Sequence, residues 1–228
     1  MFILITRDYN DNVAKKLRSL VAAGVDAYVM CDNQPSQASK RILHISDEEM
    51  ARKGWTHHMS YKGHQITAWD KSTFFAYQSE KPFAWICEDD VYWNKPSVLK
   101  EVINTDSLSD LIAYPLAPTY AEHPKWFHWD KVRQITPKQK YWTATYNQLC
   151  RLSHRLLHKM HELSQARQRL FFHEGMFGTL CKINGYQIEY LKSSDVFINF
   201  RWKPDWTKEE LTEYKKVLVH PVKEISPL

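Results

Sequence analysis

The first quarter of the chain alternates between apolar runs and one amphipathic segment. Residues 2–6 form a short apolar run that ends in polar residues, which predicts a buried strand. Over residues 10–23 the apolar positions recur at helical spacing and Gly24 ends the segment, so we expect a helix there. A second apolar run at 26–30 predicts another strand. This order predicts the start of a parallel βαβ unit.

Later segments continue the same alternation. A loop without clear periodicity, rich in Pro, His and aromatic residues, is expected over 115–137, and loops of that length are usually functional. We therefore expect a mixed α/β fold with a mostly parallel central sheet flanked by helices. Further strands are predicted at 41–45, 83–87, 110–114, 141–149 and 188–191, helices at 68–79, 154–169, 177–183 and 207–216, and a last apolar run at 217–223.

Composition narrows the class of protein. A chain of 228 residues with 43% hydrophobic residues is long enough for one sizeable core, so a single domain over 1–228 is expected. The net charge is +5, but the basic residues form no long block, so we expect no nucleic-acid partner. A modest positive field suits a small anionic substrate such as a nucleotide diphosphate.

Cysteine usage and the start of the chain bear on the compartment. The four cysteines are widely spaced and show neither zinc nor redox spacing, which indicates reduced, buried thiols. The first residues run into a strand without a basic leader, and no apolar stretch reaches the roughly 20 residues that span a bilayer. We expect a cytoplasmic protein without a membrane span, or a domain of a larger protein.

The apolar run at 83–87 ends in three consecutive acids, Glu88, Asp89 and Asp90. Open α/β sheets bind ligands at the carboxyl ends of their strands. Three adjacent carboxylates repel one another unless a cation or hydrogen-bond donors compensate, and a hard divalent ion does this well. The alternative is a solvated turn or a helix N-terminus, because residues 91–103 also have partly helical character.

The segment Trp85-Ile86-Cys87-Glu88-Asp89-Asp90-Val91 resembles the acidic signature, often written DxD, of the GT-A class of nucleotide-sugar glycosyltransferases. Residues 1–114 match that class in element order and motif position, which makes them the expected nucleotide-sugar-binding half. Residues 115–228 match more loosely, as an acceptor-binding half. The resemblance implies transfer of a sugar from a nucleotide diphosphate, most of all UDP, to a hydroxyl of a glycan or glycoconjugate. We expect inversion of configuration, with retention, which needs no catalytic base, as the alternative.

The same resemblance implies a set of metal and donor ligands. It places Mn²⁺ (or Mg²⁺) on Glu88, Asp90 and His220, with Asp90 the strongest single choice because the last acid of the signature usually ligates the ion. The first acid is Glu rather than Asp, so which of the three reach the metal stays open. His220 precedes a proline and is equally compatible with a strand end. Donor contacts are expected from residues at strand ends and nearby, which are Thr6, Arg7, Asp32, Lys71, Asp89 and Lys223.

Glu174 is the expected catalytic base. It lies in a polar His-Glu-Gly step between two apolar stretches, where burial would raise its pKa toward the range of a general base. The alternative is a favourable charge in the first turn of a helix. Asp195 and Asp130 are the substitutes.

Two other clusters have simpler explanations than chemistry. Three histidines at helical spacing, His154, His158 and His161, are interleaved with basic residues and predict a solvated basic face rather than a zinc site. Aromatic side chains that would either stack on an acceptor sugar or fill the core are Trp126, Trp129, Trp202 and Trp206.

Three other classes of protein remain as alternatives. A nucleotidyltransferase that makes nucleotide sugars would be expected to carry a glycine-rich phosphate loop after the first strand, where this chain has Thr-Arg-Asp-Tyr-Asn. A metal-dependent nuclease would need a concentrated basic track. A non-catalytic module would bind nucleotide or carbohydrate without donor hydrolysis.

Overall fold

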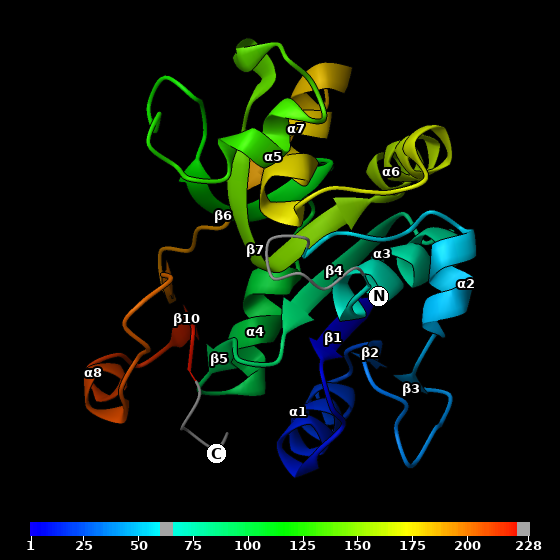
Figure 1. The fold of residues 1–228 in the computed structure, drawn as a ribbon. Helices are drawn as coiled ribbons and strands as arrows, with labels where there is room; N and C mark the ends of the chain where they lie inside the picture. The colour runs from blue at the N-terminus through cyan, green and yellow to red at the C-terminus, as the bar shows by residue number, and fades with distance from the viewer. Residues whose placement is uncertain (60–65, 223–228) are drawn as a thin grey trace.

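A seven-stranded sheet forms the centre of the computed structural model, which describes residues 1–59 and 66–222 (Figure 1). Its strand order is β3-β2-β1-β4-β7-β6-β8, and only β7 runs against the others, because it pairs antiparallel with both β4 and β6. The prediction of a mostly parallel central sheet is confirmed. The strands are β1 (Phe2–Thr6), β2 (Ala27–Cys31), β3 (Ile42–Leu43), β4 (Phe83–Glu88), β6 (Leu111–Ala117), β7 (Ala144–Ser153) and β8 (Ile188–Tyr190).

Helices cover both faces of this sheet. Because side chains alternate along β1, Ile3 and Ile5 pack on one face with α3, α6 and α7, while Phe2 and Leu4 pack on the other with α1 and α4. The prediction of flanking helices is confirmed. The helices are α1 (Asp11–Ala22), α2 (Asp47–Arg52), α3 (Ala68–Gln78), α4 (Pro96–Ile103), α5 (Trp129–Arg133), α6 (His154–Arg167), α7 (His173–Asn184) and α8 (Lys208–Thr212), with a 3₁₀ turn η2 at Gln139–Tyr141.

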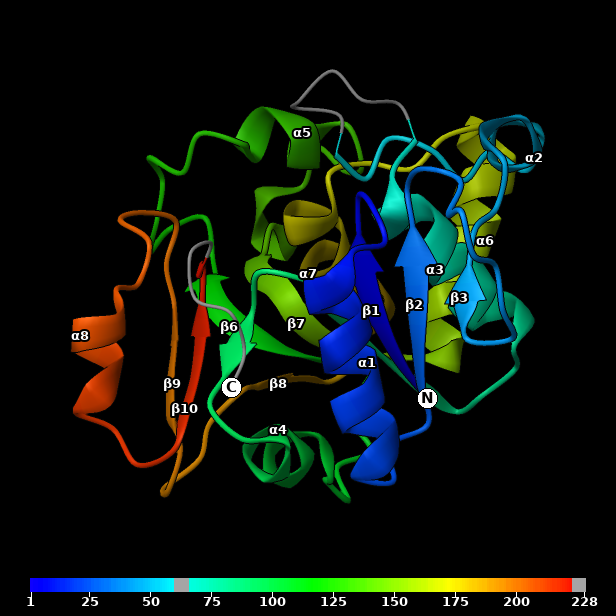
Figure 2. The same cartoon turned by 90° about the horizontal axis from the view of Figure 1, so that it is seen from below.

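A second, three-stranded sheet stands beside the first. It joins β5 (Tyr92–Trp93), β10 (Val217–His220) and β9 (Phe197–Phe200), in the order β5-β10-β9. Since β5 follows directly after the acids at the end of β4, its pairing with β10 brings a late segment of the chain next to those acids. Figure 2 shows β9 and β10 side by side, with their neighbouring loops at the same end as the arrowheads of β1 and β2.

Several boundaries differ from those expected. The segment 115–137 is not one loop, because β6 continues to Ala117 and α5 forms within it. The strand expected at 141–149 is shifted to β7 and lengthened, since it pairs along both sides. Helix α7 begins at His173 rather than 177, and the helix expected at 207–216 is shortened to α8. The sequence pattern predicted neither α2 nor β9.

The histidine face of α6 is also different from the solvated face that was expected. His154 and His161 stack on Tyr77 of α3, with ring centroids 5.8 and 4.6 Å apart. Only His158 is exposed, and it pairs with Glu162 at 3.2 Å. These rings therefore contribute to packing between α3 and α6. Within the described residues, no helix combines the length and the apolar character that crossing a bilayer requires.

Candidate metal and donor site

The three acids lie where β4 ends. Glu88 is the last residue of the strand, and the turn after it closes with Val91 N–H donating to the Glu88 carbonyl at 3.2 Å. Lys16 of α1 holds this turn from behind: its Nζ donates to the carbonyls of Asp89 at 2.6 Å and Val91 at 2.8 Å. The Lys16 side chain is buried, and burial lowers the pKa of its ammonium. The turn is thus fixed by a cation that touches its backbone.

His220, at the end of β10, meets two of the acids. Its Nε2 lies 3.1 Å from Asp90 Oδ1 and 3.4 Å from Glu88 Oε2. Ligand atoms of Glu88, Asp90 and His220 all lie within 4.8 Å of one another. The expected metal-binding residues are therefore brought together, although they come from two distant parts of the chain. Val222 N–H also donates to the Asp90 carbonyl at 3.0 Å, which ties the end of β10 to the turn.

The charges of Glu88 and Asp90 are balanced by the neighbouring His220 side chain. Burial alone would lower the pKa of His220, but hydrogen bonds to Asp90 and Glu88 outweigh it and raise the pKa to about 9. Without a metal ion, a protonated imidazole thus supplies the positive charge between the two carboxylates. The same position is one where a divalent cation would be compensated by those carboxylates.

Aromatic side chains orient Glu88 from its other oxygen. Trp69 of α3 donates from Nε1 to Glu88 Oε1 at 2.9 Å. The Trp69 ring stacks on His173 of α7, with centroids 4.1 Å apart and planes 17° apart. His173 is itself held at its carbonyl by Asn147 Nδ2 at 2.9 Å. A chain of contacts through Trp69 and His173 therefore connects Glu88 to α7 and β7.

The middle acid turns toward β1 rather than toward His220. Thr6 donates from Oγ1 to Asp89 Oδ2 at 2.5 Å. Burial raises the pKa of Asp89, and the Thr6 hydroxyl partly offsets that rise. Asp89 and Thr6 therefore form one unit at the ends of β1 and β4, as neighbours in the sheet.

Asp32 and Lys71 meet at the end of β2. Lys71 is almost fully buried in α3, and its Nζ donates to the Asp32 carbonyl at 2.7 Å and pairs with Asp47 Oδ1 at 2.9 Å. Among the described residues, Asp32 Oδ1 is buried without a hydrogen-bond partner. Burial raises the pKa of the Asp32 carboxyl to about 6. Whether Lys71 also contacts a phosphate stays a prediction.

One cavity unites most of these groups. It has a volume of ≈ 320 Å³ and opens at the carboxyl ends of β1, β2 and β4. Lys223, expected among the donor contacts, lies outside the described residues. Side chains and backbone that line the cavity come from Ile5, Thr6, Arg7, Asp32, Met59, Thr67, Ala68, Trp69, Glu88, Asp89 and Asp90.

Glu174 sits in the first turn of α7, next to His173. Gln148 of β7 donates from Nε2 to Glu174 Oε1 at 3.0 Å. Burial raises the pKa of Tyr146, and the negative charge of Glu174 raises it further. The substitutes are more open: Asp130 is 63% exposed beside Lys131, and Asp195 is exposed in the turn before β9. Glu174 is thus the one of the three carboxylates that is partly enclosed.

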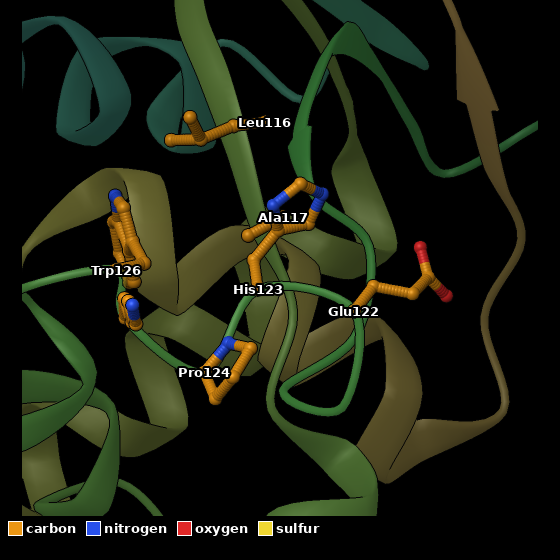
Figure 3. A pocket seen from close by; sticks show the side chains of 7 residues that line it. Leu116, Ala117, Glu122, His123, Pro124 and Trp126 are labelled. Carbon is orange, nitrogen blue, oxygen red and sulfur yellow. The ribbon is translucent and has the colours of Figure 1, made fainter.

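The tryptophans expected to stack or to fill the core divide between the two roles. Trp129 and Trp206 are buried, and Trp126 is half-buried. Trp202 is 52% exposed. A second cavity of ≈ 390 Å³ is lined by Trp126 and by the segment around His123, with the Glu122 side chain pointing outward (Figure 3). It contains none of the acids at the end of β4.

Sequence reasoning missed Lys16, Trp69 and Gln148. Lys16 stands in a polar stretch of an amphipathic helix and reads as a surface residue. Gln148 follows Asn147 in β7, so no alternation of polar and apolar residues marks it, and nothing local relates it to Glu174. Their roles depend on contacts between distant segments.

Neither a protein-family model nor a curated protein sequence matches the chain. Solved structures give weak likenesses. Against the galactosyltransferase LgtC in complex with donor and acceptor sugar analogs, identity is 13%, the TM-score is 0.42, and the match covers 87% of this chain and 76% of that one. Against an active-site mutant of LgtC, identity is 13%, the TM-score is 0.44, and the match covers 87% of this chain and 75% of that one. Against mouse xyloside xylosyltransferase 1 in its apo form, identity is 9%, the TM-score is 0.42, and the match covers 88% of this chain and 87% of that one.

Proposed function

We propose that the protein is a metal-dependent glycosyltransferase of the GT-A class. It would move a sugar from a UDP-linked donor to a hydroxyl group of a glycan or glycoconjugate, with residues 1–228 acting as one domain. The observation that carries the proposal is the meeting of Glu88, Asp90 and His220 within 4.8 Å, beside the ≈ 320 Å³ cavity at the sheet edge. Polar ligands at such an edge are typical of nucleotide sites in α/β folds.

The three side chains fit a divalent cation. Carboxylate oxygens and a neutral imidazole are ligands that Mn²⁺ accepts, and Mg²⁺ accepts the carboxylates. Glu88 is already held at its second oxygen by Trp69, which is the kind of outer contact that orients metal ligands. Bound there, the ion would neutralise charge on the departing diphosphate. Glu88, Asp90 and His220 would hold it.

The donor would lie along the cavity. Asp32 carries a buried carboxylate oxygen that accepts no hydrogen bond among the described residues, and a ribose hydroxyl or a base N–H would satisfy it. Arg7 is exposed at the same cavity and offers a charge-assisted contact to the diphosphate. Asp89 and Thr6, joined by a hydrogen bond, line the same cavity.

Glu174 would act on the acceptor. Its carboxylate takes the proton of the acceptor hydroxyl while that oxygen forms a bond to the anomeric carbon of the donor sugar. The bond from the anomeric carbon to the diphosphate oxygen breaks, and its electron pair leaves with UDP, so the configuration inverts. Gln148 holds the carboxylate in place by donating to Oε1.

Calorimetric titration of nucleotides tests the donor site. UDP and GDP are titrated in Mn²⁺ and then in EDTA, on the wild type, on Asp90→Ala and on the control Asp130→Ala. We expect UDP binding that needs Mn²⁺, is lost in Asp90→Ala and survives in the control. Absence of nucleotide binding under both conditions would return the acidic cluster to a surface turn and end the proposal.

Donor hydrolysis tests the reaction itself. If UDP binds, UDP-sugars are incubated with the protein and Mn²⁺, and release of UDP is measured against Asp90→Ala. A glycosyltransferase should hydrolyse at least one donor slowly in the absence of acceptor. Tight binding without any UDP release would favour a non-catalytic nucleotide-binding module.

A further inference from the structure

Two aromatic side chains are exposed where the structure does not need them for packing. Phe127 is 64% exposed and Trp202 is 52% exposed, and their ring centroids lie 5.6 Å apart with planes at 59°. The other exposed large hydrophobic side chains among the described residues are aliphatic. The pair joins two distant segments, the one before α5 and the one after β9. We call Phe127 and Trp202 the aromatic pair.

A first path of ring contacts leads from the aromatic pair to the acids. Phe127 packs on His128 at 4.0 Å between centroids, and His128 packs on Phe172 at 4.6 Å. Phe172 lies 5.1 Å from His173, the ring that stacks on Trp69. Trp69 donates to Glu88, so this path ends at the metal-binding cluster.

A second path reaches the same cluster through the small sheet. Trp202 follows shortly after Phe200, which stands opposite His220 in the β9–β10 pair with ring centroids 6.1 Å apart. Between them, Arg201 N–H donates to the His220 carbonyl at 3.1 Å. The two paths form a closed ring of contacts with Glu88 and His220 on one side and the aromatic pair on the other. Figure 2 shows the segment before α5 and the segment after β9 at the end of the molecule to which β1, β2 and β10 point.

The Trp202 segment is braced, although the Trp202 side chain is exposed. Arg201 lies 3.7 Å over the Trp206 ring, and its guanidinium donates to the Pro204 carbonyl at 2.6 Å and to the Asp205 carbonyl at 3.1 Å. Two apolar rings that touch each other at the surface keep a small apolar patch in water, and burying it under a ligand is favourable. The position is therefore organised for contact rather than left over from folding.

The size and surroundings of the aromatic pair favour a carbohydrate. Two rings are too small for a stable protein interface, which buries about 800 Å² on each partner. The C–H faces of a pyranose ring pack on aromatic faces, while its hydroxyls need polar neighbours. Such neighbours flank the pair on both segments, since Lys125 and Lys203 are exposed.

We propose that Phe127 and Trp202 form the platform on which a pyranose ring of the acceptor glycan stacks. This inference rests on the proposed function, because it assigns the aromatic pair to the acceptor of the proposed transfer. Near the pair, Tyr114 of β6 stacks on Phe200 at 5.2 Å between ring centroids, and Tyr146 of β7 lies 6.3 Å from Tyr114. An acceptor on the platform would extend over these tyrosines toward Glu174. The negative charge of Glu174 raises the pKa of Tyr146.

The test uses ¹⁹F NMR of the protein labelled with 5-fluorotryptophan, with the Trp202 signal assigned from Trp202→Phe. Lactose, cellobiose and maltose are titrated at millimolar concentration without nucleotide, with glycerol as the control for solvent effects. We expect at least one disaccharide to shift the Trp202 signal saturably and to leave the buried Trp129 and Trp206 signals in place. A silent Trp202, or equal shifts of all tryptophan signals, would overturn the proposal.

Variants then test the pair. Phe127→Ala should weaken the saturable response about fivefold, the loss expected for one aromatic contact. Ile183→Ala, which removes an aliphatic side chain that is 40% exposed on α7, should change nothing. An unchanged response in Phe127→Ala would overturn the role of the pair.

The result is independent of the donor titration. If Trp202 responds to a disaccharide but UDP does not bind, the platform stands as a carbohydrate site and the transferase proposal fails. If UDP binds with Mn²⁺ but Trp202 stays silent, the transferase proposal stands and the platform is wrong.

Discussion

Opposite ends of the central sheet each hold an enclosed carboxylate, and the chain treats them differently. Asp110, at the start of β6, accepts hydrogen bonds from the Arg155 guanidinium, from Ser153 Oγ at 2.8 Å and from Gln187 N–H at 3.0 Å. Asp32, at the end of β2, has a buried oxygen without a partner among the described residues. Donors from the protein therefore satisfy Asp110, whereas the Asp32 carboxylate has the Ala68 backbone N–H as a donor but keeps Oδ1 without a partner among the described residues.

The acidity of the two groups reflects this difference. Burial alone would raise the pKa of Asp110, but its hydrogen bonds to Arg155, Ser153 and Gln187 outweigh burial and hold the pKa below its usual value. Burial raises the pKa of Asp32 to about 6. A fully satisfied carboxylate stabilises the fold, whereas an unsatisfied one at a cavity is ready to accept a ligand. Four experiments test this difference.

The largest effect is expected for Glu174→Gln, which tests whether the partly enclosed carboxylate of α7 takes part in the chemistry. Turnover of an identified UDP-sugar and acceptor should fall about 10²-fold or more, since a positioned base contributes about 10² to 10⁴. Metal-dependent UDP binding should stay at the wild-type level. Glu122→Gln, at an exposed glutamate, is the control. A near-normal rate in Glu174→Gln would indicate a retaining reaction that needs no such base.

Removing the charge of Asp110 should lower the free energy of unfolding by about 2 kcal/mol at pH 7, because its donors lose an ionic acceptor. The folded pKa lies below the unfolded value near 3.9, so this contribution is complete above that value and is lost as pH falls through the folded pKa. The difference in the free energy of unfolding between wild type and Asp110→Asn, measured by urea unfolding, should therefore become smaller from pH 7 to pH 3.

The matched control for that change is an exposed ion pair. Asp26 pairs with Arg41 at 3.3 Å, and their side chains are 51% and 42% exposed. Asp26→Asn should leave the unfolding free energy almost unchanged, as exposed pairs usually do. A gap for Asp110→Asn that stays constant with pH would show that packing, rather than charge, is responsible.

Lys16→Met asks whether the cavity end also depends on donors from the protein. The turn carbonyls of Asp89 and Val91 would lose their ammonium partner, and we expect a loss of about 1.5 kcal/mol in unfolding free energy. Mn²⁺ affinity, followed by electron paramagnetic resonance of the free ion, should fall as well, because the turn is no longer fixed. Lys100→Met, whose Nζ contacts the Ala23 carbonyl at the surface, should leave Mn²⁺ affinity intact.

The smallest effect has the opposite sign. A folded pKa of about 6 for Asp32 lies above the unfolded value, so ionisation costs stability as pH rises from about 4 through 6. Asp32→Asn should therefore raise the free energy of unfolding by about 1 kcal/mol at pH 7 and by nothing near pH 3.5. Nucleotide affinity should drop in the same variant. Asp130→Asn, at an exposed site, serves as the control, and a destabilised Asp32→Asn at pH 7 would contradict the contrast.

The sequence predicted the large sheet well because its strands are continuous apolar runs. β1, β2 and β4 were found within one or two residues, and the acids were placed correctly at the end of β4. The pairing of β5, β9 and β10 could not be predicted, because two- and four-residue strands leave little periodic signal. Contacts of Lys16 with the acidic turn, and of Trp69 with Glu88, depend on tertiary packing that no local pattern contains.

The small sheet has a consequence for the order in which the chain matures. The acids leave the ribosome long before His220, and N-terminal segments generally organise first. The large sheet can therefore assemble, with Lys16 on the turn, before His220 brings its imidazole to Glu88 and Asp90. Docking of β10 against β5 then delivers the imidazole and closes Val222 onto Asp90. A divalent ion that binds all three residues would favour the docked strand by mass action, so metal supply would act on maturation before it acts on any substrate.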